Sequence, residues 1–356
     1  MPFLHALAAA ALAIVPFAAA SAQPATGQPA TGQRAPVARV GDQRIAVPLG
    51  AGTAQLAAFA DFPLAAPPAA FRRIVVVIHG TLRNADVYLD GMVAAVDAAG
   101  ARETAVIAPQ FLASVDAAAH AIPPDVLRWD VQGWKDGAGA LYPPDADPVA
   151  SSSFAALDAL LGALADRSRH PRLDTVVLAG HSAGAQVLAR YAAAGRGDAR
   201  LREAGIAVRF VIANPSSYLY LDRRRPDGEG GFAPFAADRC PGFDAYKYGL
   251  EAPNPYVAAA SREALRERLL GREIVFLLGE SDADPRHRQL DRSCPAQSQG
   301  PHRLARGLAY HAYLRAFERN DASHHRLVVV PGVGHDNRSM FGSSCGRAAL
   351  FADGSC

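Results

Sequence analysis

The chain has 356 residues; half of them are hydrophobic, a fifth are charged, and the formal net charge is +2. This composition is typical of a globular protein with a substantial core. Because the charge is nearly balanced and no polybasic run occurs, the composition argues against nucleic acid and against an anionic membrane surface as partners.

The amino-terminal segment has the features of a signal peptide, which we predict over residues 1–22. Residues 4–20 form an apolar run, and Ala20-Ser21-Ala22 is a small-x-small cleavage site. The few residues before the run include no Lys or Arg, so an uncleaved anchor and a misassigned start codon stay open as alternatives. No later apolar run reaches the roughly 18 to 20 residues of a membrane span. We expect a secreted or periplasmic protein with no membrane span after cleavage.

After a flexible linker over residues 23–36, which repeats the motif PATGQ, we expect one domain over residues 37–356. Short apolar runs rich in β-branched residues alternate there with helical patterns, which predicts strands buried on both faces of a parallel sheet. The strands are expected at residues 44–48, 55–62, 74–78, 105–108, 175–179, 208–213, 274–278 and 327–330. The helices are expected at residues 85–99, 151–165, 183–194, 262–270, 304–319 and 337–351. This alternation predicts an α/β fold with a doubly wound, mostly parallel sheet.

Residues 214–261, after the sixth strand, do not follow this rhythm. The segment is rich in proline, glycine and tyrosine and shows no clean period. A loop of this length inside a compact domain is usually functional or disordered, and its aromatic content argues against disorder. We predict a cap over the carboxyl edge of the sheet.

The four cysteines are expected to form disulfide bonds, because an exported protein meets an oxidising environment. Four cysteines allow three pairings. Cys345 and Cys356 are close in sequence and would staple the last helix, which leaves Cys240 with Cys294. A metal site is disfavoured, because no C-x-x-C pair occurs.

The motif Gly180-His181-Ser182-Ala183-Gly184 lies between a predicted strand and a predicted helix, where G-x-S-x-G forms a nucleophile elbow. The turn is tight, so the residues around the serine must be small. The helix that begins at the serine directs its amino terminus towards developing negative charge. The motif therefore predicts that Ser182 is a nucleophile.

His335 is the candidate general base. A serine hydroxyl is a weak nucleophile until a base lies within hydrogen-bond reach. His335 follows the last strand in the sequence VPGVGH, at the sheet edge where the elbow also emerges. His181 adjoins Ser182 in the elbow and points elsewhere, and His324 and His325 lie at the opposite end of the last strand, so we exclude all three.

The acid that orients the histidine should lie between Ser182 and His335, because the chain order of this arrangement is serine, acid, histidine. Three acids follow the strand at 274–278. Asp282 lies three residues past the closing glycine and can bend back to the histidine. Glu280 is too close to the strand, and Asp284 precedes a proline, which favours an extended backbone. We predict Asp282, with Asp284 as the main alternative.

Two backbone amides are expected to stabilise the oxyanion of the tetrahedral intermediate. One belongs to Ala183, the residue after the nucleophile. The other belongs to Thr81, in the sequence His79-Gly80-Thr81 that follows the third strand. An ordinary turn at the end of a strand is the alternative explanation of this second segment.

On these residues the chain resembles the α/β-hydrolase superfamily. The motifs are HGT after the third strand, GHSAG at the elbow, GESD after the seventh strand and VGH after the eighth. Four further segments resemble a group of exported bacterial and fungal α/β-hydrolases: residues 214–226, 240–250, 290–307 and 330–341. The resemblance implies the α/β-hydrolase fold and a Ser-Asp-His triad, and its G-x-x-D pattern supports Asp282.

The residues and the resemblance together predict a serine hydrolase that cleaves carboxylic esters, of small molecules or of polymers, through an acyl-enzyme. We expect no metal and no organic cofactor. An amidase, a peptidase or an acyltransferase on the same triad is an alternative. A catalytically inactive α/β-hydrolase that serves as a binding module is the non-enzymatic alternative.

Aromatic side chains in two segments are candidates for the substrate pocket. Trp129 and Trp134 follow the fourth strand, and Tyr218 and Tyr220 lie in the expected cap. They could line a pocket for an aromatic or bulky acyl group, with ordinary packing as the alternative. Residues 223–225, three consecutive arginines, are expected to form a solvated charged turn rather than a site for an acidic substrate.

Overall fold

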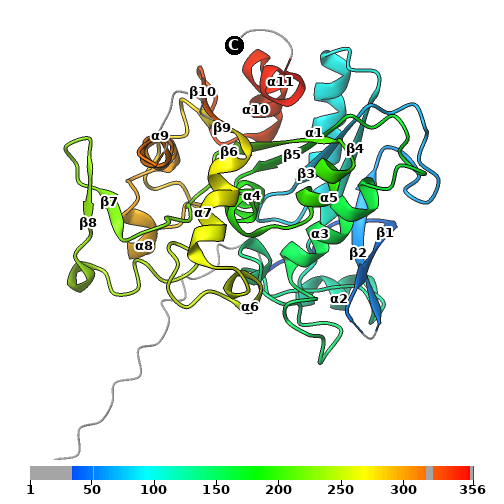
Figure 1. Ribbon diagram of the computed structural model, residues 1–356, viewed down its shortest axis with the longest axis horizontal. Coiled ribbons are helices and arrows are strands. Elements are labelled where there is room, and N and C mark those ends of the chain that lie inside the picture. Colours follow the sequence, from blue (N-terminus) through cyan, green and yellow to red (C-terminus); the bar gives the residue numbers. More distant parts are fainter. Residues whose placement is uncertain (1–33, 51, 318–323, 353–355) are drawn as a thin grey trace, which may run out of the picture.

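The computed structural model describes residues 34–50, 52–317, 324–352 and 356 (Figure 1). The predicted signal peptide and most of the predicted linker lie outside these residues. Eight strands form one sheet in the order β1-β2-β4-β3-β5-β6-β9-β10. The strands are β1 Gln43–Pro48, β2 Thr53–Ala60, β3 Arg73–Ile78, β4 Thr104–Gln110, β5 Thr175–His181, β6 Ala207–Ala213, β9 Glu273–Gly279 and β10 His325–Val330. The pairs β1·β2 and β2·β4 are antiparallel, and all other pairs in the sheet are parallel.

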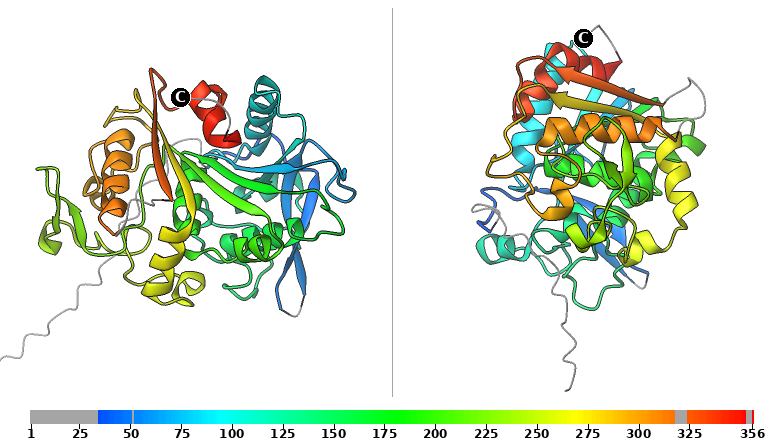
Figure 2. Two further views of the ribbon diagram at one scale, coloured as in Figure 1. Left: turned by 45° about the horizontal axis from the view of Figure 1, so that its top comes forward. Right: turned by 90° about the vertical axis from the view of Figure 1, so that its left-hand side faces the viewer.

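Helices cover both faces of the sheet (Figures 1 and 2). The helices are α1 Ala85–Ala98, α2 Ser114–His120, α3 Ser153–Leu164, α4 Ala183–Ala194, α5 Asp198–Glu203, α6 Pro255–Ala258, α7 Arg262–Gly271, α8 Cys294–Gln297, α9 Arg303–Arg315, α10 Asn337–Gly342 and α11 Ser344–Phe351. Helices α1, α10 and α11 pack on one face, and α3, α4, α5, α7 and α9 pack on the other. The prediction of a doubly wound, mostly parallel sheet is confirmed.

The side chains of each central strand point alternately into two hydrophobic cores. In β3, Ile74, Val76 and Ile78 face one core, whereas Val75 and Val77 face the other. The sequence of β3 is therefore continuously apolar, as expected for a strand covered on both sides. Burial on both faces holds these strands rigidly, which suits them to position a site at their ends.

The register brings the carboxyl ends of the central strands to one edge. Ile78 of β3 pairs with Gly180 of β5, Gly180 pairs with Ile212 of β6, and Ile212 pairs with Phe276 of β9. The loops that follow β3, β5, β9 and β10 consequently leave the sheet on the same side. These loops contain the residues that the sequence singles out.

The expected helix over residues 337–351 is wrong in one respect, because the structure has two helices there. Helix α10 ends at Gly342, and Ser343 begins α11 by accepting a hydrogen bond from the Gly346 amide at 2.8 Å. A serine in this position favours a new helix start over continuation. The short helices α2, α5 and α8 were not predicted either.

Residues 214–261 are ordered around a small two-stranded sheet of β7 Arg224–Pro226 and β8 Phe232–Pro234, with the single turns η2 Ala237–Arg239 and α6. The expectation of a solvated arginine turn is wrong for Arg225, which is buried. Its guanidinium pairs with Asp244 at 3.1 Å and lies over the ring of Tyr220. That this segment caps the active site stays a prediction.

Two disulfide bonds are present, Cys240–Cys294 and Cys345–Cys356, the pairing that chain proximity suggested. The first joins residues 214–261 to the loop after β9.

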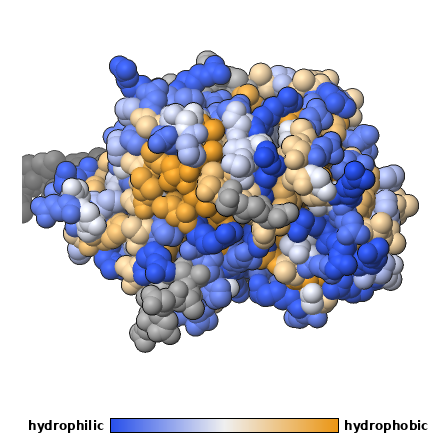
Figure 3. Space-filling view, turned by 90° about the horizontal axis from the view of Figure 1, so that it is seen from above, coloured by the Kyte–Doolittle hydropathy of each residue, from blue (hydrophilic) through white to orange (hydrophobic). Residues whose placement is uncertain are grey.

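Among the described residues, no helix is long and apolar enough to cross a membrane. Strand β10 is an open edge of the sheet, and Val329 on it and Leu308 on α9 stay exposed. Seen from above, hydrophobic side chains gather in one area of the molecular surface (Figure 3).

Candidate active site

Ser182 lies in a sharp turn between β5 and α4. Its backbone angles are φ 58° and ψ −114°, a conformation that non-glycine residues rarely adopt. The turn is held because the Ser182 amide donates to the carbonyl oxygen of Ala213 at 3.0 Å. Ser182 is thus held directly between the last residue of β5 and the first residue of α4.

Glycine at two positions lets the elbow pack closely. A Cβ atom on Gly184 would lie 2.1 Å from the carbonyl oxygen of Ile78, and one on Gly180 would lie 2.6 Å from the backbone of Gly184. No side chain fits in either place. The first turn of α4 therefore lies directly against the end of β3, which brings the loop after β3 next to the nucleophile.

His335 lies within hydrogen-bond distance of the serine. Its Nε2 atom is 2.9 Å from Ser182 Oγ, and its Nδ1 atom is 2.7 Å from Asp282 Oδ2. Its loop is tied to the loop after β9, because the amide of Ser281 donates to the carbonyl of Val333 at 2.9 Å. The structure thus brings together the three side chains that the sequence selected as nucleophile, base and acid.

The two competing acids have other partners. Glu280 accepts the amide of Gly332 at 2.8 Å, and Asp284 accepts the amide of Arg286 at 2.9 Å. The second carboxylate oxygen of Asp282 instead receives a hydrogen bond from the guanidinium of Arg303 at 3.3 Å. Both side chains of this ion pair are buried.

The environment keeps the base neutral and the acid ionised. Burial and the nearby charge of Arg303 lower the pKa of His335, against the opposing effect of its hydrogen bond to Asp282. Burial acts to raise the pKa of Asp282, but the hydrogen bonds and charges of His335 and Arg303 outweigh it and lower that pKa. An imidazole next to an ionised carboxylate can accept the serine proton at neutral pH.

Neither a family model nor a curated protein matches the sequence. The structure is similar to that of LpqC, a poly(3-hydroxybutyrate) depolymerase from Bordetella parapertussis, with a TM-score of 0.57 and 23% sequence identity over 85% of this chain and 86% of that chain. It is also similar to poly(aspartic acid) hydrolase-1 from Sphingomonas sp. KT-1, with a TM-score of 0.55 and 25% identity over 86% of this chain and 96% of that chain. The chain has the α/β-hydrolase fold.

In this α/β-hydrolase fold, the segment that follows β3 is held by the buried histidine of the HGT motif, for which the sequence indicated no such role. His79 Nε2 accepts the amide of Phe111 at 2.9 Å, so the ring proton is on Nδ1 and is donated to the Gly80 carbonyl at 2.9 Å. Burial lowers the pKa of His79 to about 4, which keeps this tautomer neutral. The histidine fixes the loop in which Thr81, the expected oxyanion donor, lies.

Thr81 and Ala183 are both buried; Thr81 follows β3, and Ala183 is the first residue of α4. The hydroxyl of Thr81 accepts a hydrogen bond from the ammonium of Lys135 at 3.0 Å. Lys135 is itself buried, in the turn η1 Gly133–Lys135. That the amides of Thr81 and Ala183 hold an oxyanion stays a prediction.

Asn214 is a further residue that sequence reasoning missed. It follows β6 with a positive φ of 52° and has no exposed surface. Its Oδ1 atom accepts the Gly279 amide at 2.8 Å, and its Nδ2 atom donates to the Gly334 carbonyl at 3.4 Å. It therefore joins the start of the acid loop to the histidine loop. No sequence motif signals such a contact, since its partners lie far away in the chain.

The four aromatic residues proposed for the substrate pocket lie in the core, with no exposed area: Trp129, Trp134, Tyr218 and Tyr220. This placement corrects the expectation that they line an open pocket. Trp134 stacks on Phe111 and lies 4.7 Å, between ring centroids, from His79. Trp134 thus packs against the loop after β3 and does not contact solvent.

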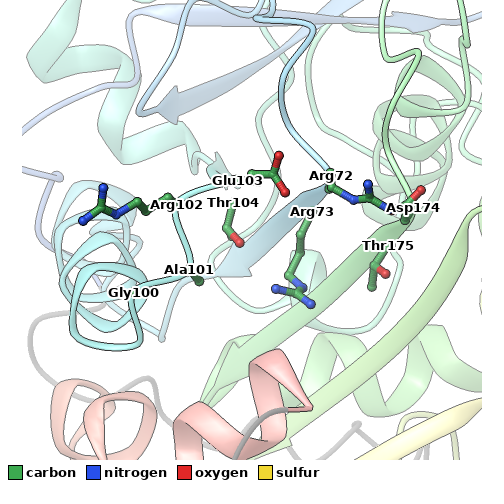
Figure 4. Close-up of a pocket in the computed structure, with 9 residues that line it drawn as sticks. All are labelled: Arg72, Arg73, Gly100, Ala101, Arg102, Glu103, Thr104, Asp174 and Thr175. Carbon is green, nitrogen blue, oxygen red and sulfur yellow. The ribbon is translucent and has the colours of Figure 1, made fainter.

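A pocket of about 410 Å³ lies at the opposite edge of the sheet, at the amino ends of β3, β4 and β5 (Figure 4). Its lining includes Arg73, Glu103 and an ion pair between Arg72 and Asp174. No histidine and no serine of the described part of the chain lines it, and the elbow lies at the other ends of these strands. The described residues contain no cluster of three or more His, Cys, Asp or Glu side chains that could hold a metal ion.

Proposed function

We propose that this protein is a serine hydrolase that cleaves carboxylic esters through an acyl-enzyme, with Ser182, His335 and Asp282 as its catalytic triad. The observation that carries the proposal is the continuous chain of contacts at 2.9 Å and 2.7 Å from Ser182 Oγ through the imidazole to Asp282. A serine in a strained elbow with this arrangement is the constellation that nucleophilic catalysis requires.

In the first half-reaction, His335 Nε2 takes the proton from Ser182 Oγ as the oxygen attacks the ester carbonyl. The negative charge of the tetrahedral intermediate would be held by the amides of Thr81 and Ala183 and by the amino terminus of α4. The carboxylate of Asp282 keeps the imidazole oriented and stabilises the imidazolium. His335 then gives its proton to the leaving alcohol, which departs and leaves the acyl group on the serine.

In the second half-reaction, water replaces the alcohol. His335 removes a proton from the water, which attacks the acyl carbon, and the same two amides hold the second oxyanion. The imidazolium returns the proton to Ser182 Oγ, and the carboxylic acid leaves. Arg303 contributes by position: its charge favours the carboxylate form of Asp282 throughout.

The test is hydrolysis of 4-nitrophenyl butyrate by the wild type and by Ser182→Ala. We expect the substitution to reduce kcat by a factor on the order of 10⁴ or more, because it removes the nucleophile. Ester hydrolysis that is unchanged in this variant would refute the proposal.

Amide hydrolysis is a second candidate, favoured by the similarity to poly(aspartic acid) hydrolase-1. The bonds that join a polymer of aspartic acid are amides, and the same triad can attack them. Comparison of a 4-nitrophenyl ester with the 4-nitroanilide of the same acid separates the two candidates. A kcat/KM for the anilide equal to that for the ester would favour the amidase.

We also propose that the protein is exported and that residues 214–261 cover the site. Disulfide bonds form and persist in oxidising compartments, and the chain contains two. The segment packs onto the loop after β4, because Tyr246 Oη and Asn254 Nδ2 both donate to the carbonyl oxygen of Asp136, at 2.5 Å and 2.8 Å. That loop also contains Lys135, which contacts Thr81.

A further inference from the structure

The loop after β3 is anchored at both of its ends by buried side chains. His79, at its start, accepts the amide of Phe111 at 2.9 Å. Arg83, at its end, forms an ion pair with Asp116 at 2.9 Å, and neither side chain of this pair has any exposed area. These anchors fix where the loop begins and ends, and they leave the orientation of Thr81, in its middle, to other contacts.

The backbone of Thr81 leaves its amide available. The amide of Arg83 donates to the carbonyl of Gly80 at 3.1 Å and closes a turn. Thr81 is the second residue of this turn, a position whose amide takes no part in the closing hydrogen bond. Among the described residues, no acceptor receives the Thr81 amide. A buried amide of this kind is what an oxyanion hole requires.

Lys135 holds the side chain of Thr81. Its ammonium donates to Thr81 Oγ1 at 3.0 Å and to Gln132 Oε1 at 2.7 Å. Its own amide donates to the Gln132 carbonyl at 3.0 Å and closes the turn η1. Arg190 of α4 donates to the Lys135 carbonyl at 3.5 Å. The ammonium therefore reaches Thr81 from a backbone that is tied to the helix beginning next to the nucleophile.

A contact that fixes the hydroxyl of Thr81 also restricts its backbone. Threonine is β-branched, so few rotamers about its Cα–Cβ bond are open to it. With Oγ1 held and both ends of the loop anchored, the peptide plane that carries the Thr81 amide has little freedom to turn. A hydrogen bond from a charged donor is roughly twice as strong as one from a neutral donor, so an ammonium is well suited to this task.

The ammonium is kept at this position at a cost. Burial, together with the charge of Lys247, lowers the pKa of Lys135 to about 7. The charge of Arg83 acts in the same direction, whereas the charges of Asp136 and Asp291 oppose it. An apolar side chain of similar length would fill the same space without this desolvation cost. What the lysine adds is its charge and its hydrogen bonds.

We propose that Lys135 is a positioning residue of the oxyanion hole, whose ammonium fixes the Thr81 hydroxyl and thereby directs the Thr81 amide towards the oxyanion that forms on attack by Ser182. This inference rests on the proposed function and adds a residue to it. Lys135 acts through Thr81 and transfers no proton itself. Its removal should weaken the stabilisation of the transition state and leave the binding of an uncharged ester nearly unchanged.

The kinetic test is a double-mutant cycle of Lys135→Met and Thr81→Val, assayed with 4-nitrophenyl butyrate. Each substitution removes the contact and keeps the backbone amide. Each should lower kcat by about 30-fold and change KM by less than about twofold. The double variant should lose no more than either single variant, because the same contact is already absent. The control Arg326→Met removes an exposed charge at the amino end of β10 and should keep the wild-type kcat.

Three outcomes of this cycle would overturn the proposal. The first is an unchanged kcat in Lys135→Met, and the second is a double variant in which the two losses multiply. The third is a rise in KM that accounts for the whole loss, since a residue that only supports the shape of the binding site would act in that way. If Lys135→Met does not fold, Thr81→Val tests the same contact from its other side, and an unchanged kcat there overturns the proposal.

A second test does not depend on turnover. When propylboronic acid binds, the Ser182 oxygen bonds to boron and the serine proton passes to His335, which gives a tetrahedral anion with an oxygen where the oxyanion would form. Calorimetry should show that Lys135→Met raises the Kd of this adduct by about tenfold and that Arg326→Met leaves it unchanged.

The boronate result separates this proposal from the proposed function. An equal Kd in the wild type and in Lys135→Met would overturn the positioning role even if esters are cleaved. A raised Kd for Lys135→Met, in a protein that cleaves no ester, would retain the positioning role and refute the proposed function. Absence of boronate binding to the wild type would refute both, because both require an oxyanion site next to Ser182.

Discussion

Replacement of Gly184 by alanine measures how much the proposed chemistry depends on the close packing of the elbow. The new Cβ atom would lie 2.1 Å from the Ile78 carbonyl oxygen, and real Cβ contacts are essentially never shorter than 3.0 Å. The start of α4 and the end of β3 must therefore separate by most of an ångström. The expected oxyanion donors Thr81 and Ala183 belong to these two segments, so their spacing changes by the same amount.

A displacement of about 1 Å in a catalytic constellation costs on the order of a hundredfold in rate. We therefore expect Gly184→Ala to lower kcat/KM for 4-nitrophenyl butyrate by about 10²-fold. Gly180→Ala should cost less, because its closest contact would be 2.6 Å. The matched control is Gly271→Ala at the end of α7, where a Cβ atom meets nothing within 4 Å.

Circular dichroism establishes that each variant is folded before its activity is compared. Wild-type activity in a folded Gly184→Ala variant would show that the spacing between the elbow and β3 does not matter for the reaction. An equal loss in Gly271→Ala would show that the effect is not specific to the elbow. Either result would refute the reasoning about the oxyanion loop.

Three further predictions concern the acid, its arginine and the carboxyl-terminal disulfide. Asp282→Asn should lower kcat by about 10⁴-fold, whereas Asp284→Asn should change it by less than about twofold, and steady-state kinetics distinguishes the two. In the wild type, the acid limb of kcat/KM should lie below the ordinary histidine pKa of 6.5, because burial and Arg303 lower the pKa of the base. Arg303→Met should move that limb to higher pH, since it removes a positive charge that disfavours the imidazolium; an unmoved limb would contradict this role. Replacing Cys345 and Cys356 by serine should lower the free energy of unfolding by about 3 kcal/mol, as urea denaturation would show, and leave kcat/KM unchanged; a loss of activity would contradict the second part.

The residues of the elbow could be predicted because their signals are local. A strand that is apolar on both faces, a serine flanked by small residues and a helix are contiguous in the chain, so the position of Ser182 follows from short-range constraints. His335 could be selected by its place after the last strand. Asp282 was separable from Asp284 by its distance from the strand and by the proline that follows the latter.

The supporting residues could not be predicted, because their partners are distant in the sequence. Asn214 contacts the loops after β9 and β10, and Arg303 approaches Asp282 only because α9 packs beside β9. The burial of Trp134 likewise depends on Phe111 and His79, which belong to other loops. An aromatic residue in a segment without periodicity gives no indication of whether it lies in the core or at the surface.

The most direct test of the central claim is labelling by a fluorophosphonate, which reacts with activated serines. The wild type should be labelled on Ser182, as identified by peptide mass spectrometry, and Ser182→Ala should not be labelled at all. His335→Ala should be labelled much more slowly, because the serine then lacks its base. Labelling of a different residue, or equal labelling of the wild type and Ser182→Ala, would contradict the proposed triad.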